Sequence, residues 1–250
     1  MPVRVKRSFF CFGVVLASLA CEQLTRCQEN SGESSRILDR TVESFSVEDV
    51  TPLDAVLELG RHEQIPLGIE YIDREVVGKP VSVAVGRSTV RDILDMFVPV
   101  GRGYLYRVQN GVVVVTQKNV PAGKKNILNT ILSEFAVNRT DLQQASSLLW
   151  MTLYKTLYPV PGPHGFVGTR RPGNPENIVG PFSLHNVTVR EALNRLVSER
   201  KNAAWIVRVP AKYMNQLPNE GLWMIAEYET PPRRYGETLR RSLFGSKPPN

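Results

Sequence analysis

The chain has 250 residues and a mass of 28.1 kDa, enough for one large domain or two small ones. Hydrophobic residues make up 42% of it and charged residues 22%, which excludes wholesale disorder and a membrane protein with several spans. Three cysteines and three histidines are too few and too scattered for a disulfide-dense fold or for a zinc site with ordinary ligand spacing. We therefore expect no metal and no cofactor.

The first twenty residues predict a secretory signal peptide. Arg4, Lys6 and Arg7 form a basic start without an acid, and the stretch 8–20 that follows is apolar and uncharged. Its length of about 13 residues is short of the roughly 20 that a membrane-spanning helix needs. An uncleaved N-terminal anchor is the alternative.

The predicted cleavage site lies directly before Cys21. Leu19-Ala20-Cys21 resembles the end of a bacterial lipoprotein signal, although Ser18 stands where that pattern has leucine. Cys21 is therefore a candidate lipidation site, and pairing with Cys27 or a free thiol are the alternatives. Residues 21–41 are polar and rich in Ser and Glu, which predicts a flexible leader.

A first α+β unit is predicted over 42–118, where alternating segments predict strands and helical spacing predicts two helices. Thr51-Pro52 and Ser88-Thr89 are typical helix starts. Asn110-Gly111 between two alternating runs is a strong hairpin signal. The predicted order is strand, helix, strand, strand, helix, strand, strand, with strands at 43–47, 66–71, 80–85, 103–109 and 111–116 and helices at 52–62 and 89–97.

A second α+β unit is predicted over 126–229, after a basic, breaker-rich boundary at 118–125. We expect a long strand over 127–137 and a helix capped by Thr140, with Leu148 among its inward residues. The stretch 159–181 is rich in Pro and Gly and predicts a loop insertion. A strand near 181–184, a helix from Thr188 and strands at 203–209 and 222–228 complete the unit. Residues 230–250 predict a disordered basic tail.

The two units share a pattern that favours internal duplication. Thr89-Val90-Arg91-Asp92-Ile93-Leu94 matches Thr188-Val189-Arg190-Glu191-Ala192-Leu193 at equivalent places in the predicted order. Each motif places an acid three residues after the threonine, as in a capping box. Any capped amphipathic helix can look similar, so the fold class predicted here is α+β with two tandem units, the second one diverged.

The first unit resembles the short N-terminal domain of secretins and TonB-dependent receptors. The resemblance covers about a third of the chain and is carried by Phe45-Ser46-Val47, Thr51–Leu57, Pro66–Tyr71, Val81-Ser82-Val83, Ser88–Leu94 and Gly103–Tyr106. It implies a small periplasmic domain that packs two helices against mixed sheets and contacts partner proteins. It implies no catalytic residue, so the chain is expected not to be an enzyme.

Candidate chemistry is sparse in this sequence. No Gly-x-Ser-x-Gly elbow, Walker loop or dinucleotide fingerprint occurs. Trp205 and Trp223 lie in apolar strands, where core packing is the default. Trp150, Tyr154 and His164 are candidates for a pocket beneath the 159–181 loop. That pocket would make the chain a small envelope hydrolase or a carbohydrate-binding protein with the loop as a lid, which is the alternative function.

The basic charge of the chain is concentrated at its ends. The formal charge is +7, yet residues 21–229 hold 23 basic and 23 acidic residues, because three basic residues lie in 1–20 and five, against one acid, lie in 230–250. The tail therefore suits anionic lipid or an acidic protein surface, and nucleic acid is not expected. The sequence predicts an exported periplasmic or membrane-anchored protein that binds another envelope protein by strand addition at a sheet edge.

Overall fold

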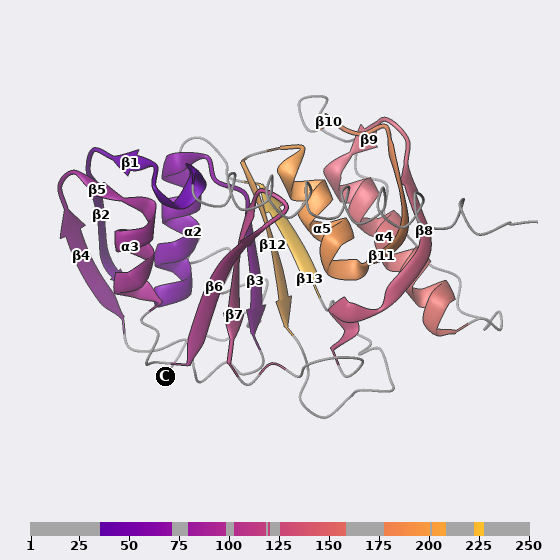
Figure 1. Cartoon of the computed structure of the whole chain (residues 1–250), viewed down its shortest axis with the longest axis horizontal. Coiled ribbons are helices and arrows are strands. Elements are labelled where there is room, and N and C mark those ends of the chain that lie inside the picture. Colours follow the sequence, from indigo (N-terminus) through magenta and orange to yellow (C-terminus); the bar gives the residue numbers. More distant parts are fainter. Residues whose placement is uncertain are drawn as a thin grey trace, which may run out of the picture.

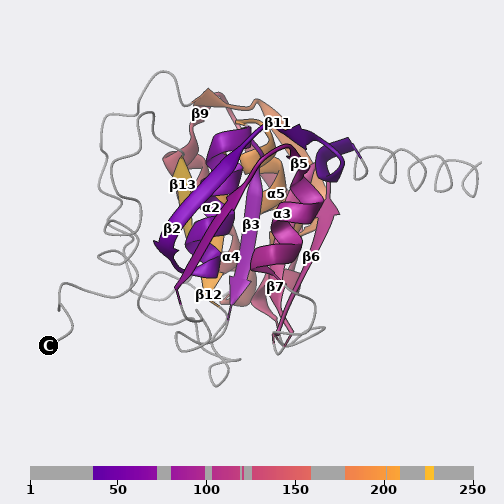
Figure 2. The ribbon, with the colours of Figure 1, turned by 90° about the vertical axis from the view of Figure 1, so that its left-hand side faces the viewer.

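The computed structural model describes residues 36–71, 80–98, 103–118, 120, 126–158, 178–200, 202–208 and 223–227. The protein is an α+β fold, as predicted. Its elements stack in layers, with a central sheet between two pairs of helices and a two-stranded sheet outside each pair (Figure 1). Figure 2 looks through these layers from the side of the first unit.

The first unit has the predicted order of elements, with two further short strands. Its long helices are capped by Thr51 and Thr89, whose side chains each accept a hydrogen bond from a backbone N–H three residues later. Asn110 and Gly111 both have positive φ, as the predicted hairpin turn requires. The elements are β1 (Thr41–Val42), β2 (Phe45–Val50), α2 (Pro52–Glu63), β3 (Leu67–Tyr71), β4 (Val81–Val85), β5 (Ser88–Thr89), α3 (Val90–Phe97), β6 (Tyr104–Gln109) and β7 (Val112–Gln117).

The second unit follows this order in its described part, except that no strand equivalent to β3 is found there. Its elements are η3 (Ile127–Asn129), β8 (Ile131–Val137), β9 (Thr140–Asp141), α4 (Leu142–Leu157), β10 (Ile178–Val179), β11 (Phe182–Thr188), α5 (Val189–Ser198), β12 (Ala203–Arg208) and β13 (Trp223–Glu227). The predicted Pro/Gly insertion falls between α4 and β10. Most of it, like the signal peptide, the leader and the tail, lies outside the described residues.

Three details of the second unit differ from the prediction. The cap of α4 is Asp141, whose carboxylate accepts a hydrogen bond from the Gln144 amide at 2.9 Å, because the helix begins at Leu142, one residue later than a Thr140 cap requires. Leu148 is 36% exposed and so is not a core residue of α4. The predicted strand over 127–137 begins only at Ile131, because the Asn126 side chain accepts from the Leu128 amide and starts a 3₁₀ turn.

The two units meet in one sheet. Its strand order is β13-β12-β3-β7-β6, so that β3 of the first unit lies between β7 and β12 and runs parallel to both. The hairpin partners β6 and β13 close the sheet as antiparallel outer strands (Figure 1). Residues far apart in sequence are therefore joined by the hydrogen bonds of one continuous ladder.

Each face of this sheet supports one hydrophobic core. The helices α2 and α3 cover one face and α4 and α5 cover the other. Alternate residues of β7 point to opposite cores, which is why all four valines of the run Val112–Val115 are fully buried. A strand buried on both faces needs such an uninterrupted apolar run.

The strand registers support an internal duplication. Phe45 lies opposite Val85 in the β2–β4 pair, and Phe135 lies opposite Leu184 in the β8–β11 pair. Both phenylalanines are buried under their own unit's helices. Equivalent residues are thus 90 positions apart in β2 and β8 (45 and 135) and 99 positions apart in β4 and β11 (85 and 184).

The second helices of the two units begin in the same way. Thr89 and Thr188 both form a capping box with an acid three residues later. The next residue of each helix, Val90 or Val189, donates its amide 3.0 Å to a backbone carbonyl at equivalent places, Arg40 and Thr130. The spacing of 99 residues continues through β6 and β12, which start at 104 and 203.

Trp205 sits on the strand pair that joins the units. It is fully buried, and its indole Nε1 donates to Asn194 Oδ1 at 2.8 Å, which confirms the predicted core role. Gly68 lies opposite it on β3. A Cβ atom at Gly68 would stand 2.2 Å from Trp205 Cζ2, so the indole ring occupies the space that any side chain there would need.

A buried ion pair also joins the units. Glu70 on β3 is 1% exposed and receives two hydrogen bonds from the guanidinium of Arg190 on α5, one of them 3.1 Å long. Asn126 donates to the same carboxylate at 3.4 Å, and Arg190 also donates to Asn129 Oδ1. Residues of β3, of the segment before β8 and of α5 therefore satisfy one another's buried polar groups.

Replacing Gly68 by alanine tests the close contact with Trp205. We expect Gly68→Ala to lower the free energy of unfolding by about 1–3 kcal/mol, the usual cost of overpacking a core, as measured by urea denaturation. Gly86→Ala is the matched control, because a Cβ there meets nothing within 4 Å. Equal stability of both variants would contradict the packing described here.

Removing one partner of the buried pair tests the polar connection between the units. Arg190→Met leaves Glu70 charged and unpaired inside the protein, and we expect a loss of about 3–5 kcal/mol in the same assay. The equivalent surface substitution Arg91→Met, which removes an exposed ion pair with Asp39, is expected to cost at most about 1 kcal/mol. If both variants lose a similar free energy of unfolding, the buried ion pair of Arg190 does not stabilise the fold more than the exposed ion pair of Arg91.

Candidate functional site

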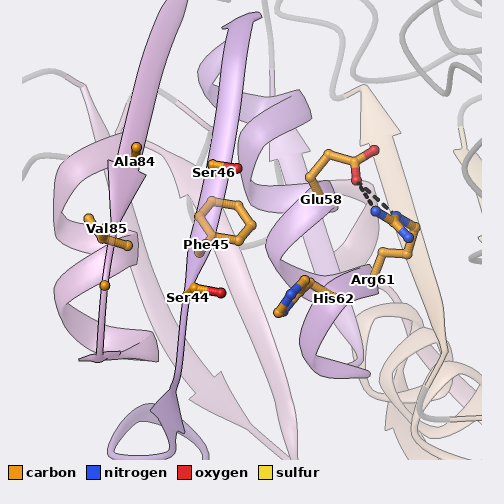
Figure 3. Close-up of a pocket in the computed structure, with 9 residues that line it drawn as sticks. Ser44, Phe45, Ser46, Glu58, Arg61, His62, Ala84 and Val85 are labelled. Carbon is orange, nitrogen blue, oxygen red and sulfur yellow. Dashed lines mark hydrogen bonds and ion pairs between the residues drawn. The ribbon is translucent and has the colours of Figure 1, made fainter.

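A pocket of about 350 Å³ opens between α2 and the β2–β4 sheet (Figure 3). Ser44 and Ser46 of the β2 segment lie on one side of it, and Glu58, Arg61 and His62 of α2 lie on the other. The lining is completed by Phe45, Ala84, Val85 and Gly86. We call this pocket the β2–α2 groove.

The polar side chains of the groove are held by their neighbours on α2. Arg61 donates to Glu58 Oε2 at 2.8 Å, so the two charges are paired side by side on the helix. His62 Nδ1 lies 2.7 Å from Glu63 Oε1, and its ring makes an edge contact with the Phe45 ring, with centroids 6.0 Å apart. Of these polar groups of α2, Glu58, Arg61 and His62 line one side of the groove.

The groove runs beside an open strand edge. Among the described residues β2 pairs only with β4, so its other edge has no strand partner. Figure 3 shows α2 on that side of β2, away from β4. An extended peptide laid along β2 would gain main-chain hydrogen bonds from the strand and side-chain contacts from the helix, the arrangement used in peptide binding by strand addition.

The second unit does not repeat this chemistry. The positions equivalent to Glu58 and Arg61, 90 residues later on α4, are Leu148 and Met151. The charged pair on the helix is therefore replaced by two apolar residues in the second unit. Among the described residues, the charged pair of the groove belongs to the first unit alone.

A second set of polar side chains lies at the outer edge of the central sheet. The hydroxyl of Tyr106 on β6 donates to Asp95 Oδ1 on α3 at 2.7 Å. Burial, and then the hydrogen bond to the Asp95 carboxylate, raise the pKa of Tyr106 to about 12. One turn earlier on α3, Arg91 donates to Asp39 Oδ1 at 3.0 Å, and this hydrogen bond raises the pKa of Arg91.

The pocket predicted from the sequence is only partly described. Trp150 and Tyr154 are half-buried and lie one turn apart on α4, and the Tyr154 ring lies 5.0 Å from that of Tyr158 between centroids. His164 lies outside the described residues, as do Cys21 and most of the 159–181 loop. The pocket and the hydrolase or carbohydrate-binding alternative therefore stay predictions.

Sequence reasoning missed the β2–α2 groove. Glu58, Arg61 and His62 follow one another on a helix whose other face is apolar, a pattern typical of a solvated helix surface. These side chains line a groove only because β2 lies beside α2. The sequence of the helix does not indicate which strand packs next to it. The one available signal was His62 close to the end of α2.

Comparisons with models of protein families, with curated proteins and with solved structures found no match. The resemblance to the short N-terminal domain of secretins and TonB-dependent receptors therefore stays a prediction. The described residues contain no helix that is both long and apolar enough to cross a membrane.

The raised pKa of Tyr106 gives a test of its hydrogen bond to Asp95 at the outer edge of the central sheet. A tyrosine whose pKa is higher in the folded state stabilises the fold fully below its ordinary value of about 10 and loses that contribution as the pH rises toward 12. We expect Asp95→Asn to lower the pKa of Tyr106 but to keep it above the ordinary value, because burial remains. The Tyr106 signal is read from the absorbance of phenolate, taken as the difference from Tyr106→Phe. An unchanged pKa in Asp95→Asn would contradict the hydrogen bond.

Proposed function

We propose that the protein is an exported, non-catalytic protein-interaction module of the bacterial cell envelope, accessory to secretion or TonB-type transport. Its partner is another envelope protein. The resemblance of the first unit motivates the choice of compartment and partner class. The layered packing of two helices against small sheets in 42–118 is the arrangement that this resemblance leads one to expect.

The observation that carries the proposal is the open edge of β2 beside the positioned side chains of α2. Main-chain hydrogen bonds along β2 would supply affinity that does not depend on sequence, and Glu58, Arg61 and His62 would select among side chains of the bound segment. Because Glu58 and Arg61 carry opposite charges, the groove suits a polar segment without a strong net charge.

Attachment to the membrane belongs to the same proposal. A lipid on Cys21, or contact of the basic tail at 230–250 with anionic lipid, would keep the folded body close to its partner. Both features rest on the sequence, since these segments lie outside the described residues. The stretch 21–229 between them is formally neutral, which does not favour binding to nucleic acid.

The test is affinity capture from bacterial envelope extract with the full mature chain, followed by cross-linking and mass spectrometry. We expect a partner whose cross-links fall on β2 and α2. Ser46→Arg places a long side chain in the groove and is expected to weaken capture by about tenfold, comparable to a lost interface contact.

The matched control is Ala136→Arg, which changes the equivalent exposed position on β8. It is expected to leave capture unchanged, and equal melting temperatures of both variants establish that neither is unfolded. No partner above an empty matrix would overturn the proposed function. A partner that both variants capture as well as the wild type would overturn the assignment to the β2–α2 groove.

A further inference from the structure

Two equivalent hairpins differ in what lies along their outer edge. The hairpin β12–β13 of the second unit pairs through β12 with β3, in parallel. The hairpin β6–β7 of the first unit is its equivalent, since β6 and β12 are 99 positions apart over their whole length. Among the described residues, no strand pairs with the outer edge of β6.

The side chains around the two edges correspond one to one. Trp205 donates to Asn194 Oδ1 at 2.8 Å in the second unit, and 99 positions earlier Tyr106 donates to Asp95 Oδ1 at 2.7 Å. Both rings are thereby tied to the middle of the second helix of their own unit. The two edges have the same construction.

A second correspondence lies one helical turn earlier. Arg190 donates to Asn129 before β8, and Arg91 donates to Asp39, the equivalent residue before β2. Arg190 also holds Glu70, which β3 supplies. Among the described residues Arg91 has its ion pair with Asp39, and no neighbouring strand supplies a carboxylate to it as β3 does to Arg190.

Exposure follows the presence of β3. Trp205 and Asn194 are fully buried, and the Arg190 side chain is 10% exposed. In the first unit Tyr106 is only half-buried, Asp95 is exposed and the Arg91 side chain is 43% exposed. The same construction is therefore covered by β3 in the second unit and left uncovered in the first among the described residues.

The reverse face of the strand shows the same difference. Leu105 on β6 is 48% exposed, whereas its equivalent, Ala204 on β12, is fully buried in the first unit's core. That core covers β12 because α2 lies over it. A large apolar side chain on an uncovered strand next to the open edge gives a partner an area to bury.

We propose that the outer edge of β6, together with α3, is a second docking surface that accepts a parallel β-strand from a partner protein. The strand has the pattern of β3, with a small residue opposite Tyr106 and a polar residue opposite Val108, because Gly68 and Glu70 hold these register positions against Trp205 and Val207. The inference rests on the proposed protein-binding function but concerns a different edge from the β2–α2 groove.

The charges around Arg91 specify the polar residue further. Asn129 of the second unit is replaced by Asp39, and Asn194 is replaced by Asp95, so the first unit already carries the acids that neutralise its arginine. A carboxylate in the place of Glu70 would add a further negative charge beside these acids. The strand that fits therefore has an uncharged hydrogen-bonding side chain there, such as glutamine.

The probe is a synthetic peptide with the sequence of residues 65–71 in which glutamine replaces Glu70, carrying a benzophenone at its N-terminus. The parallel register places that end next to the start of β6. We expect photo-cross-links to the full-length protein within 103–106, and saturation of cross-linking with rising peptide concentration. Cross-links concentrated near Gln109 or spread over the surface would overturn the parallel docking.

Two control peptides test the pattern. Valine in place of the glycine is expected to weaken binding by about tenfold, because it clashes with the Tyr106 ring as a side chain at Gly68 would with Trp205. The peptide with the original glutamate is expected to bind less well than the glutamine peptide. Equal binding of the valine peptide would overturn the inference.

Protein variants separate this inference from the proposed function. Arg91→Ala is expected to weaken binding of the glutamine peptide several-fold and to leave capture of the envelope partner unchanged. Ser46→Arg is expected to weaken capture of the partner and to leave peptide binding unchanged. Peptide binding without any captured partner would support the β6 edge and contradict the proposed function of the groove. A captured partner without peptide binding would support the proposed function and overturn the docking surface at the β6 edge.

Discussion

The whole fold depends on β3, a strand of five residues that both units share. Its two edges pair with β7 and β12. Leu67 and Ile69 on one face belong to the first unit's core, and Gly68 on the other face lies against Trp205 of the second core. Gly68 lets the Trp205 ring lie against the backbone of β3, and Glu70 supplies the carboxylate that Arg190 needs in a buried place. Glycine inside a strand weakens it, so its presence here is explained by the close approach of the indole.

The two units carry equivalent strand edges, and an internal duplication explains why one of them, on β12, is paired with β3 while the other, on β6, has no strand partner among the described residues. Two copies of a unit can associate through β3 and β12 without closing into a ring, because the contact joins different edges of the two copies. One edge of the first copy is then left without a partner. The tyrosine, aspartate and arginine beside that edge keep the geometry of their buried equivalents, while the residues around them have become acidic.

The local features of the fold followed from the sequence, and the contacts between distant segments did not. Thr51, Thr89 and Thr188 cap helices as predicted, and Asn110-Gly111 forms the predicted turn, because both signals act over a few residues. Thr140 and Asp141 are adjacent residues that both suit a cap; the helix begins at Leu142, so Asp141 and not Thr140 caps it. The alternation of β3 shows that it is a strand but not that β12 lies beside it, and the groove on α2 was hidden for the same reason.

The two units form one cooperative body through β3, and native-state hydrogen exchange is the measurement that distinguishes this from two independent units. For one cooperative body, we expect the slowest amides of β7 and β12 to exchange with the same free energy of opening, equal to that of global unfolding. Gly68→Ala then lowers both by the same amount. If β12 opens at a clearly lower free energy than β7, the second unit detaches on its own and the two units are not one cooperative body.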